Sequence, residues 1–220
     1  SISEHVELSV VAAFPESLPA TEGDVLTATT NLADEDGLGA ITFQWRRAGV
    51  AIDGATGSTY TLAQADVGKT IDAVASYTDG ENTSESATSA ATATVANVND
   101  APVLTITGTA TENQELTANL YDEDGLPADQ ITYHWSRDDS VISGAIGTTY
   151  TLAQDDVGKT ITATASYTDL QTTVESVTSD PTAAVLNVND APTGSVTITG
   201  TPPEDQTLTA INDLADKDGR

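Results

Sequence analysis

The chain has 220 residues and a formal net charge of −27, with 34 acidic residues against seven lysines and arginines. Such a surface repels nucleic acid phosphates and anionic lipid headgroups, which argues against both as partners, and it attracts cations. There is no cysteine, which excludes disulfides, zinc–thiolate sites and a cysteine nucleophile, and no apolar run approaches the about 18 residues that indicate a membrane-spanning helix.

The first expected strand contains Val6, Leu8 and Val10, which alternate with other residues in the period of a strand. A DEDG loop at 34–37 follows the second strand, and the turn QADVG at 64–68 precedes the fifth. In that turn an aspartate can accept bonds from backbone N–H groups and a glycine can take a positive φ. Further strands of this first copy are expected at 25–32, 40–47, 59–62, 71–77 and 86–95.

The same pattern then recurs. TLAQADVGKT begins at Thr61 and TLAQDDVGKT at Thr151, and NVNDAP begins at Asn97 and again at Asn187, an offset of 90 residues in both cases. This period is too long for a solenoid repeat and fits one small all-β domain, so two-sheet sandwiches are predicted. The second copy's strands are expected near 103–107, 116–121, 131–135, 161–167 and 174–185.

The strings ITFQWRRAGVAIDGATGSTYTLAQADVGKTI and VNDAP carry a resemblance. A tryptophan in the third strand, a D-x-G turn and a strand of small residues resemble the immunoglobulin-like (Ig-like) fold, without its cysteine pair. The strings closely resemble the tandem Ig-like or cadherin-like repeats of giant bacterial surface adhesins of the RTX, type I-secreted kind. The resemblance implies an all-β chain of tandem Ig-like β-sandwich repeats with calcium-binding interdomain linkers.

The predicted organisation places repeat 1 at 1–96, a linker at 97–101, repeat 2 at 102–186, a linker at 187–191 and a truncated third repeat at 192–220. Arg220 follows only two strands of the third repeat, so the chain is expected to be a segment of a longer protein.

Strand direction alternates along a sandwich, so acidic loops of neighbouring repeats are expected to converge at each linker. The first junction is expected to gather Glu22, Asp66, Asn97, Asn99, Asp100, Asp122, Asp124 and Asp169. The second is expected to gather Glu112, Asp155, Asp156, Asn187, Asn189, Asp190, Asp216 and Asp218. At the free end of repeat 1, the corresponding acidic residues are Asp34, Asp36 and Asp79.

Several carboxylates held close together repel one another unless something compensates their charge. Calcium does so by taking six to eight oxygen ligands at about 2.3–2.6 Å. The NVND linker and D-x-D-G loop are similar to the D-x-N-D-N-x-P linker and D-x-D loop of cadherins, although the linker begins with Asn97 or Asn187 instead of aspartate. The alternative is that D-x-D-G is an ordinary turn on an acidic surface, and turn capping alone explains Asp66 and Asp156.

Other candidate sites are weaker. Trp45 and Trp135 are predicted to lie in the sandwich cores, and His134 to point outward. The two histidines differ between repeats, so no Ser-His-Asp triad is expected. The carboxylates lie in turns without aromatic subsites, so glycoside hydrolysis, and enzymatic activity in general, is not predicted. The arginines Arg46, Arg47 and Arg137 are expected to be solvated or to pair with neighbouring carboxylates.

The sequence therefore predicts a calcium-rigidified extender or stalk segment of a long extracellular bacterial adhesin, which spaces a ligand-binding tip from the cell surface. Its expected partners are calcium and the neighbouring repeats of a monomeric rod. Two alternatives remain. One is an Ig-like module that binds a glycan or a protein, and the other is a subunit of a polymerising surface layer or filament, in which the third repeat pairs its strands with another chain.

Overall fold

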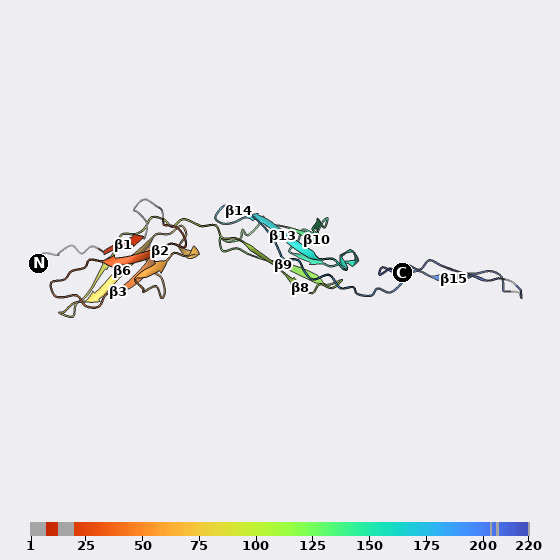
Figure 1. The fold of residues 1–220 in the computed structure, drawn as a ribbon, viewed down its shortest axis with the longest axis horizontal. Helices are drawn as coiled ribbons and strands as arrows, with labels where there is room; N and C mark the ends of the chain where they lie inside the picture. Colours follow the sequence, from red (N-terminus) through yellow and green to blue (C-terminus); the bar gives the residue numbers. More distant parts are fainter. Residues whose placement is uncertain (1–7, 13–19, 203, 206, 220) are drawn as a thin grey trace. The chain divides into compact units, whose positions relative to one another are not determined.

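The computed structural model describes residues 8–12, 20–202, 204–205 and 207–219. It divides into two compact units, residues 1–100 and 101–220, and both are built from antiparallel β-strands (Figure 1). The prediction of an all-β fold is confirmed. Val6 of the expected first strand, and His5, one of the two histidines, lie outside the described residues. In the part of the chain that the structure describes, no helix has the length and apolar character to cross a membrane.

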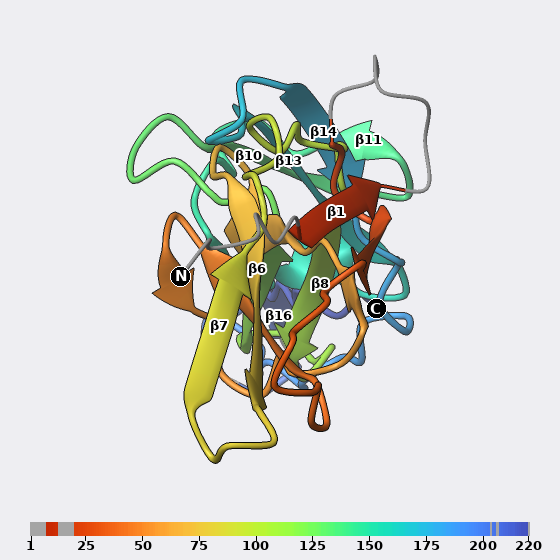
Figure 2. The same cartoon turned by 90° about the vertical axis from the view of Figure 1, so that its left-hand side faces the viewer.

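Unit 1 consists of two sheets. One has the strand order β1-β2-β5 and the other β4-β3-β6-β7, and β6 and β7 run side by side in Figure 2. A 3-10 turn, η1 (Gln64–Asp66), follows β5. The strands are β1 (Leu8–Ala12), β2 (Val25–Thr30), β3 (Thr42–Arg47), β4 (Val50–Ala51), β5 (Thr59–Thr61), β6 (Ile71–Thr78) and β7 (Ser84–Thr88).

The core of unit 1 lies between these sheets and is centred on Trp45, which is fully buried. Trp45 pairs across the ladder with Ala73, so a small side chain leaves room for a large one. Its indole N–H donates to the carbonyl of Gly57 at 2.9 Å, and its ring stacks on Tyr60 with 5.7 Å between centroids. Alternate residues of β6 are buried, as the period of a strand requires. Ile71 and Ala73 pack in this core, and Ala75 and Tyr77 pack in a neighbouring cluster with Leu32.

Unit 2 repeats this plan with sheets ordered β12-β9-β8 and β11-β10-β13-β14. Trp135 is again fully buried, and it pairs with Ala163. The predicted core position of both tryptophans is therefore confirmed, and His134 between two buried residues of β10 is exposed, as expected. The strands are β8 (Val103–Gly108), β9 (Glu115–Tyr121), β10 (Thr132–Arg137), β11 (Ser140–Val141), β12 (Thr149–Thr151), β13 (Ile161–Thr168) and β14 (Val174–Thr178), with η2 at Gln154–Asp156.

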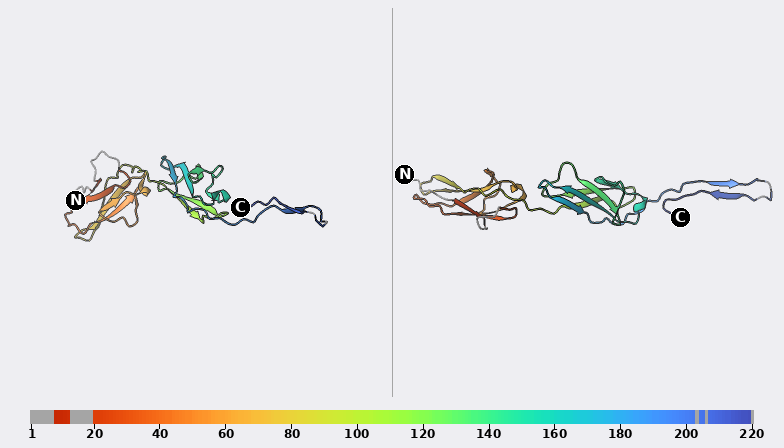
Figure 3. Two further views of the ribbon diagram at one scale, coloured as in Figure 1. Left: turned by 45° about the vertical axis from the view of Figure 1, so that its right-hand side comes forward. Right: turned by 90° about the horizontal axis from the view of Figure 1, so that it is seen from above.

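Unit 2 also contains a separate hairpin of β15 (Val196–Thr199) and β16 (Thr209–Asn212). Among the described strands, these two pair only with each other (Figure 3). Val196, Ile198 and Ile211 are 60%, 70% and 52% exposed. An isolated two-stranded hairpin is marginally stable in water, so this part of unit 2 gains little from its own packing.

The last strand of each repeat differs from its prediction. A continuous strand was expected at 86–95 and at 174–185, but β7 and β14 end at Thr88 and Thr178. The next residue, Ser179, is buried and accepts the N–H of Ala163 with its side-chain oxygen at 3.1 Å, while its own N–H donates to the carbonyl of Ala163 at 2.9 Å. The hydroxyl of Ser179 thus takes the place of a backbone carbonyl as the acceptor for the N–H of Ala163. The regular ladder between β13 and β14 therefore ends at Thr178.

Candidate metal centre

Three carboxylates from distant parts of the sequence meet within unit 2. Glu112 lies in the turn between β8 and β9, Asp190 in the segment after β14, and Asp218 in the loop after β16. One oxygen from each lies within 4.8 Å of the others. Glu112 is only 3% exposed, and the other two residues are half-buried. Like charges at this separation and degree of burial repel strongly unless a cation or a proton compensates them.

Backbone donors fix part of this cluster. The N–H of Val188 donates to Glu112 Oε2 at 3.2 Å, and the N–H of Asp190 donates to Asp218 Oδ2 at 2.7 Å. These bonds leave Asp190 Oδ2 and Asp218 Oδ1 buried without a hydrogen-bond partner. Buried acceptors without partners are rare in folded proteins, and carboxylate oxygens are the ligands that calcium prefers.

The other residues predicted for this junction surround the cluster without joining it. Asp216 Oδ1 accepts the N–H of Asp218 at 3.0 Å and so shapes the loop. Asn187 Oδ1 accepts a bond from Gln154 at 3.4 Å, and the side-chain amide of Asn189 donates to the carbonyl of Asp190 at 3.1 Å. Asp155 is exposed on η2.

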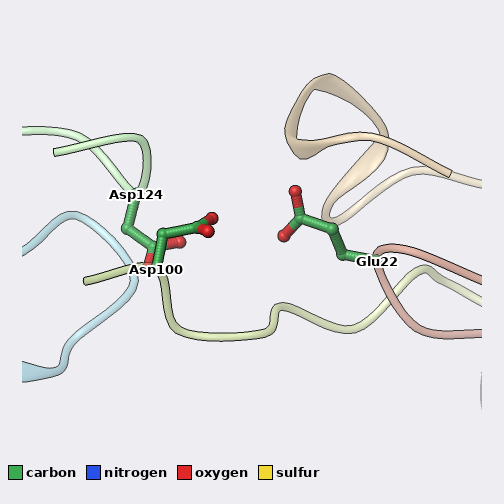
Figure 4. A group of neighbouring side chains, drawn as sticks. All are labelled: Glu22, Asp100 and Asp124. Atoms are coloured by element: carbon green, nitrogen blue, oxygen red, sulfur yellow. The ribbon is translucent and has the colours of Figure 1, made fainter.

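Glu22 and Asp100 were both predicted for the first junction, and both belong to unit 1. Their carboxylates lie within 4.8 Å of each other (Figure 4). Asn97 Oδ1 is buried without a hydrogen-bond partner, and the side chain of Asn99 donates to the carbonyl of Asp100 at 3.3 Å. Asp124, also drawn in Figure 4, belongs to unit 2 and is 2% exposed. The convergence of the complete first set stays a prediction.

A second acidic cluster lies within unit 1, where Asp34, Asp79 and Glu85 each place an oxygen within 4.8 Å of the others. The hydroxyl of Tyr77 lies 3.0 Å from Asp34 Oδ2 and 2.7 Å from Glu85 Oε2, although it has a single hydrogen to donate. The bond to Glu85 and burial raise the pKa of Tyr77. Asp36 lies outside this cluster and donates its backbone N–H to Asp34 Oδ1 at 2.9 Å.

Glu85 was not among the sequence candidates. It lies on β7 in a run of serine and threonine, and nothing in that run resembles a metal motif. The available signal was the strand register, because Glu85 pairs directly with Tyr77 on β6. A predicted pairing of the last two strands would have placed it next to the Asp34 loop.

The corresponding end of unit 2 buries three carboxylates. Asp122, Asp124 and Asp169 are 6%, 2% and 5% exposed. Tyr167 donates its hydroxyl to Asp122 Oδ2, and Asp169 Oδ1 accepts the N–H of Thr173 at 2.7 Å, which leaves Asp169 Oδ2 buried without a partner. Burial first, and then the bond to Asp122, raise the pKa of Tyr167.

Asp66 and Asp156 require a correction, because neither joins a carboxylate cluster. Asp156 is fully buried. Its Oδ1 accepts Arg137 Nε at 2.6 Å, and its Oδ2 accepts the hydroxyl of Tyr150 at 2.8 Å and the N–H of Ala153 at 2.7 Å. Both oxygens are therefore occupied by donors of the protein. Asp66 is held in the same way by Arg47, Tyr60 and Ala63.

The arginines were expected either to be solvated or to pair with neighbouring carboxylates, and the structure shows that they pair with carboxylates. Arg47 and Arg137 hold the buried aspartates, and Arg46 Nε lies 2.5 Å from Asp72 Oδ1. The turn-capping explanation for Asp66 and Asp156 is correct but incomplete, since the same carboxylates also anchor an arginine and a tyrosine.

No protein-family model and no curated protein matches the chain. Among solved structures, extracellular domains 3–5 of Drosophila OTK are similar, with 14% identity, a TM-score of 0.37 and coverage of 94% of this chain and 76% of that one. The fibronectin(III)-like modules of CbhA from Clostridium thermocellum are also similar, with 17% identity, a TM-score of 0.24 and coverage of 82% and 94%. Neither likeness assigns a function.

Proposed function

We propose that the chain is a calcium-stiffened spacer, a stalk segment of a long extracellular bacterial adhesin, without enzymatic activity. One observation carries this proposal. Glu112, Asp190 and Asp218 come from three distant segments of unit 2, and their oxygens lie within 4.8 Å of one another. Two buried oxygens of this cluster have no partner. A divalent cation would satisfy both the charge and the unpaired acceptors, with water completing its shell of six to eight oxygens.

The proposed mechanism follows from where these residues lie. Asp190 belongs to the connecting segment 187–191, Glu112 to the preceding sandwich and Asp218 to the loop after β16. An ion shared by all three would tie the connecting segment to both sides and restrict its backbone. Without the ion, carboxylate repulsion opposes the two backbone hydrogen bonds that remain. The segment would then act as a hinge.

The repeat extends this proposal along the chain. Glu22, Asp100 and Asp124 occupy the positions of Glu112, Asp190 and Asp218 in the preceding copy, and we propose the same role for them. An affinity of about 10⁻⁴–10⁻³ M suits extracellular calcium-binding modules. The resemblance to RTX-type adhesin repeats supports an extracellular location on a bacterial surface, where an affinity in this range would be sufficient.

The experiment compares Glu112→Gln with Glu115→Gln by calorimetry and small-angle scattering, in calcium and in chelator. Glu115 is exposed on β9 and serves as the matched control. Calcium should raise the melting temperature and the maximum dimension of the wild type and of Glu115→Gln. Glu112→Gln should lose most of the effect in unit 2 while its fold in chelator is unchanged. An equal response of all three proteins to calcium would overturn the proposal.

A specific observation also favours a polymerising subunit. The hairpin β15–β16 exposes Val196, Ile198 and Ile211, and no other strand in the described part of the chain pairs with it. Exposed strand edges of this kind accept strands from another chain. Light scattering at increasing protein concentration separates the two functions, because a stalk segment stays monomeric and a polymerising subunit grows.

A binding module would carry surface features that one repeat has and the other lacks. Tyr121 is 64% exposed and Val174 is 81% exposed in unit 2, where the corresponding residues of unit 1 are Ala33 and Ser84. Binding of glycans or proteins that disappears in Tyr121→Ala would favour the module over the spacer.

A further inference from the structure

We infer that Lys217 is a built-in cation that sets how strongly the second junction, formed by Glu112, Asp190 and Asp218, depends on calcium. This inference rests on the proposed function. Lys217 lies in the DKDG loop at 216–219, and its Nζ is 4.0 Å from Asp190 Oδ1. The two earlier copies of the loop carry glutamate at this position, Glu35 and Glu123. The chain has only seven lysines and arginines. A lysine in place of glutamate changes the charge of this loop by two units.

The cluster itself has the features of a ligand site beyond its negative charge. Glu112 is 3% exposed, and Asp190 Oδ2 and Asp218 Oδ1 are buried without a hydrogen-bond partner. Lys217 does not fill this need, since it approaches the other oxygen of Asp190 and its side chain is 72% exposed. The ammonium therefore lies at the edge of the cluster, and the two unpartnered oxygens remain for an incoming ion.

A tethered ammonium at this distance has two opposite effects. Without metal it offsets part of the repulsion among the three carboxylates, so the junction is less strained than one with glutamate in the loop. When a divalent cation arrives, the same positive charge repels it. Both effects make the free energy of calcium binding less favourable. Both become smaller at high salt, because salt screens the exposed ammonium. The DKDG junction should therefore bind calcium more weakly than a DEDG junction.

The competing explanation is a solvated surface lysine, because exposed ion pairs contribute little and a pair at 4.0 Å is long. The two explanations differ in what happens to calcium affinity when the charge is removed. A solvated lysine predicts no change, whereas a lysine that repels the bound ion predicts tighter binding.

The test titrates the full chain with calcium chloride at low ionic strength and follows the amide NMR signals of Val188 and Asp190. These N–H groups donate to Glu112 and Asp218, so they report on this site alone. Lys217→Met removes the charge and nearly keeps the length, and Lys217→Glu restores the charge of the earlier loops. Lys159→Glu is the control, because it makes the same charge reversal beside Asp138, where Lys159 Nζ lies 3.0 Å from the carboxylate.

We expect the calcium midpoint to fall about threefold in Lys217→Met, the order of magnitude for a solvent-screened charge, and to stay unchanged in Lys159→Glu. It should fall about tenfold in Lys217→Glu, because this substitution changes the charge by twice as much. High salt should reduce these differences. Equal midpoints in the wild type and both Lys217 variants would overturn the inference and leave the calcium site intact. Val188 and Asp190 signals that do not respond to calcium in any protein would overturn the proposed function itself.

Discussion

Asp156 is fully buried and accepts hydrogen bonds with both of its oxygens, so it should be among the most sensitive side chains of unit 2. Asp156→Asn removes the charge that holds Arg137 and leaves the guanidinium without its carboxylate. Breaking such a pair from one side destabilises a protein by about 3 kcal/mol when one partner is fully buried. We expect a loss of this size in the free energy of unfolding of unit 2, measured by urea denaturation.

Asp155→Asn provides the matched control, because Asp155 is the adjacent, exposed residue of the same 3-10 turn. Its effect should stay within about 0.5 kcal/mol, as for most surface substitutions. Unit 1 has its own network around Asp66 and should unfold at its usual urea concentration in both variants. If the two variants were equally stable, Asp156 would be a turn cap and nothing more.

Tyr150 should make unit 2 sensitive to alkaline pH. Burial first, and then the bond to Asp156, raise the pKa of Tyr150 from 10.0 to about 12. Because the folded-state pKa exceeds the unfolded value, the neutral phenol stabilises the fold fully below pH 10 and this contribution is lost as pH rises towards 12. Tyr150→Phe should flatten the fall in stability of unit 2 between these values.

The measurement is urea unfolding at several pH values between 8 and 12, and Tyr121→Phe is the control. Tyr121 is 64% exposed on β9 and lies outside the network. A Tyr150→Phe curve that falls as steeply as the control curve would show that other groups cause the alkaline loss.

The sequence did not predict which buried side chains pair with each other. Asp66 and Asp156 were placed among the metal ligands because acidic residues in loops look alike until burial is known. The signal that could have separated them is that arginine, tyrosine and aspartate recur together, as Arg47, Tyr60 and Asp66 and again 90 residues later. Such a recurrence indicates a shared structural contact as readily as a ligand set.

The strand segments themselves were predictable, because burial alternates with a period of two along β6 and β13. The end of the last strand was not. Its continuation past Thr178 has the composition of a strand, and whether the next N–H of β13 meets a carbonyl or the hydroxyl of Ser179 depends on tertiary geometry. Propensity does not encode that choice.

Ser179→Ala tests this irregular strand end. The substitution removes the acceptor for the buried N–H of Ala163, and an unsatisfied buried donor costs about 1–3 kcal/mol. Unit 2 should be destabilised by this amount, and the Ala163 amide should exchange with solvent faster. Ser176→Ala is the control, since Ser176 is exposed and its hydroxyl lies 3.1 Å from the hydroxyl of Ser166. Equal stability and equal exchange in the two variants would show that the hydroxyl is dispensable.

The net charge of −27 offers a simpler explanation for any effect of calcium, because cations of every kind screen a strongly acidic chain. Site binding and screening differ in their ion selectivity. Calcium accepts irregular sets of six to eight oxygens, whereas magnesium requires near-ideal octahedral geometry at about 2.0–2.1 Å and gives up its water reluctantly. Glu112, Asp190 and Asp218 come from separate segments, and two backbone N–H groups of the connecting segment hold Glu112 and Asp218. Such an irregular set of oxygens favours calcium.

We therefore predict that calcium at about 1 mM raises the melting temperature of the full chain by several degrees more than magnesium at the same concentration. Sodium chloride of matched ionic strength should have a small effect, because screening depends on ionic strength and not on the size of the ion. Calorimetry in chelator followed by each salt measures the three responses. If magnesium stabilised the chain as well as calcium, the acidic surface as a whole would be the origin of the effect, and the three carboxylates would have no selective role.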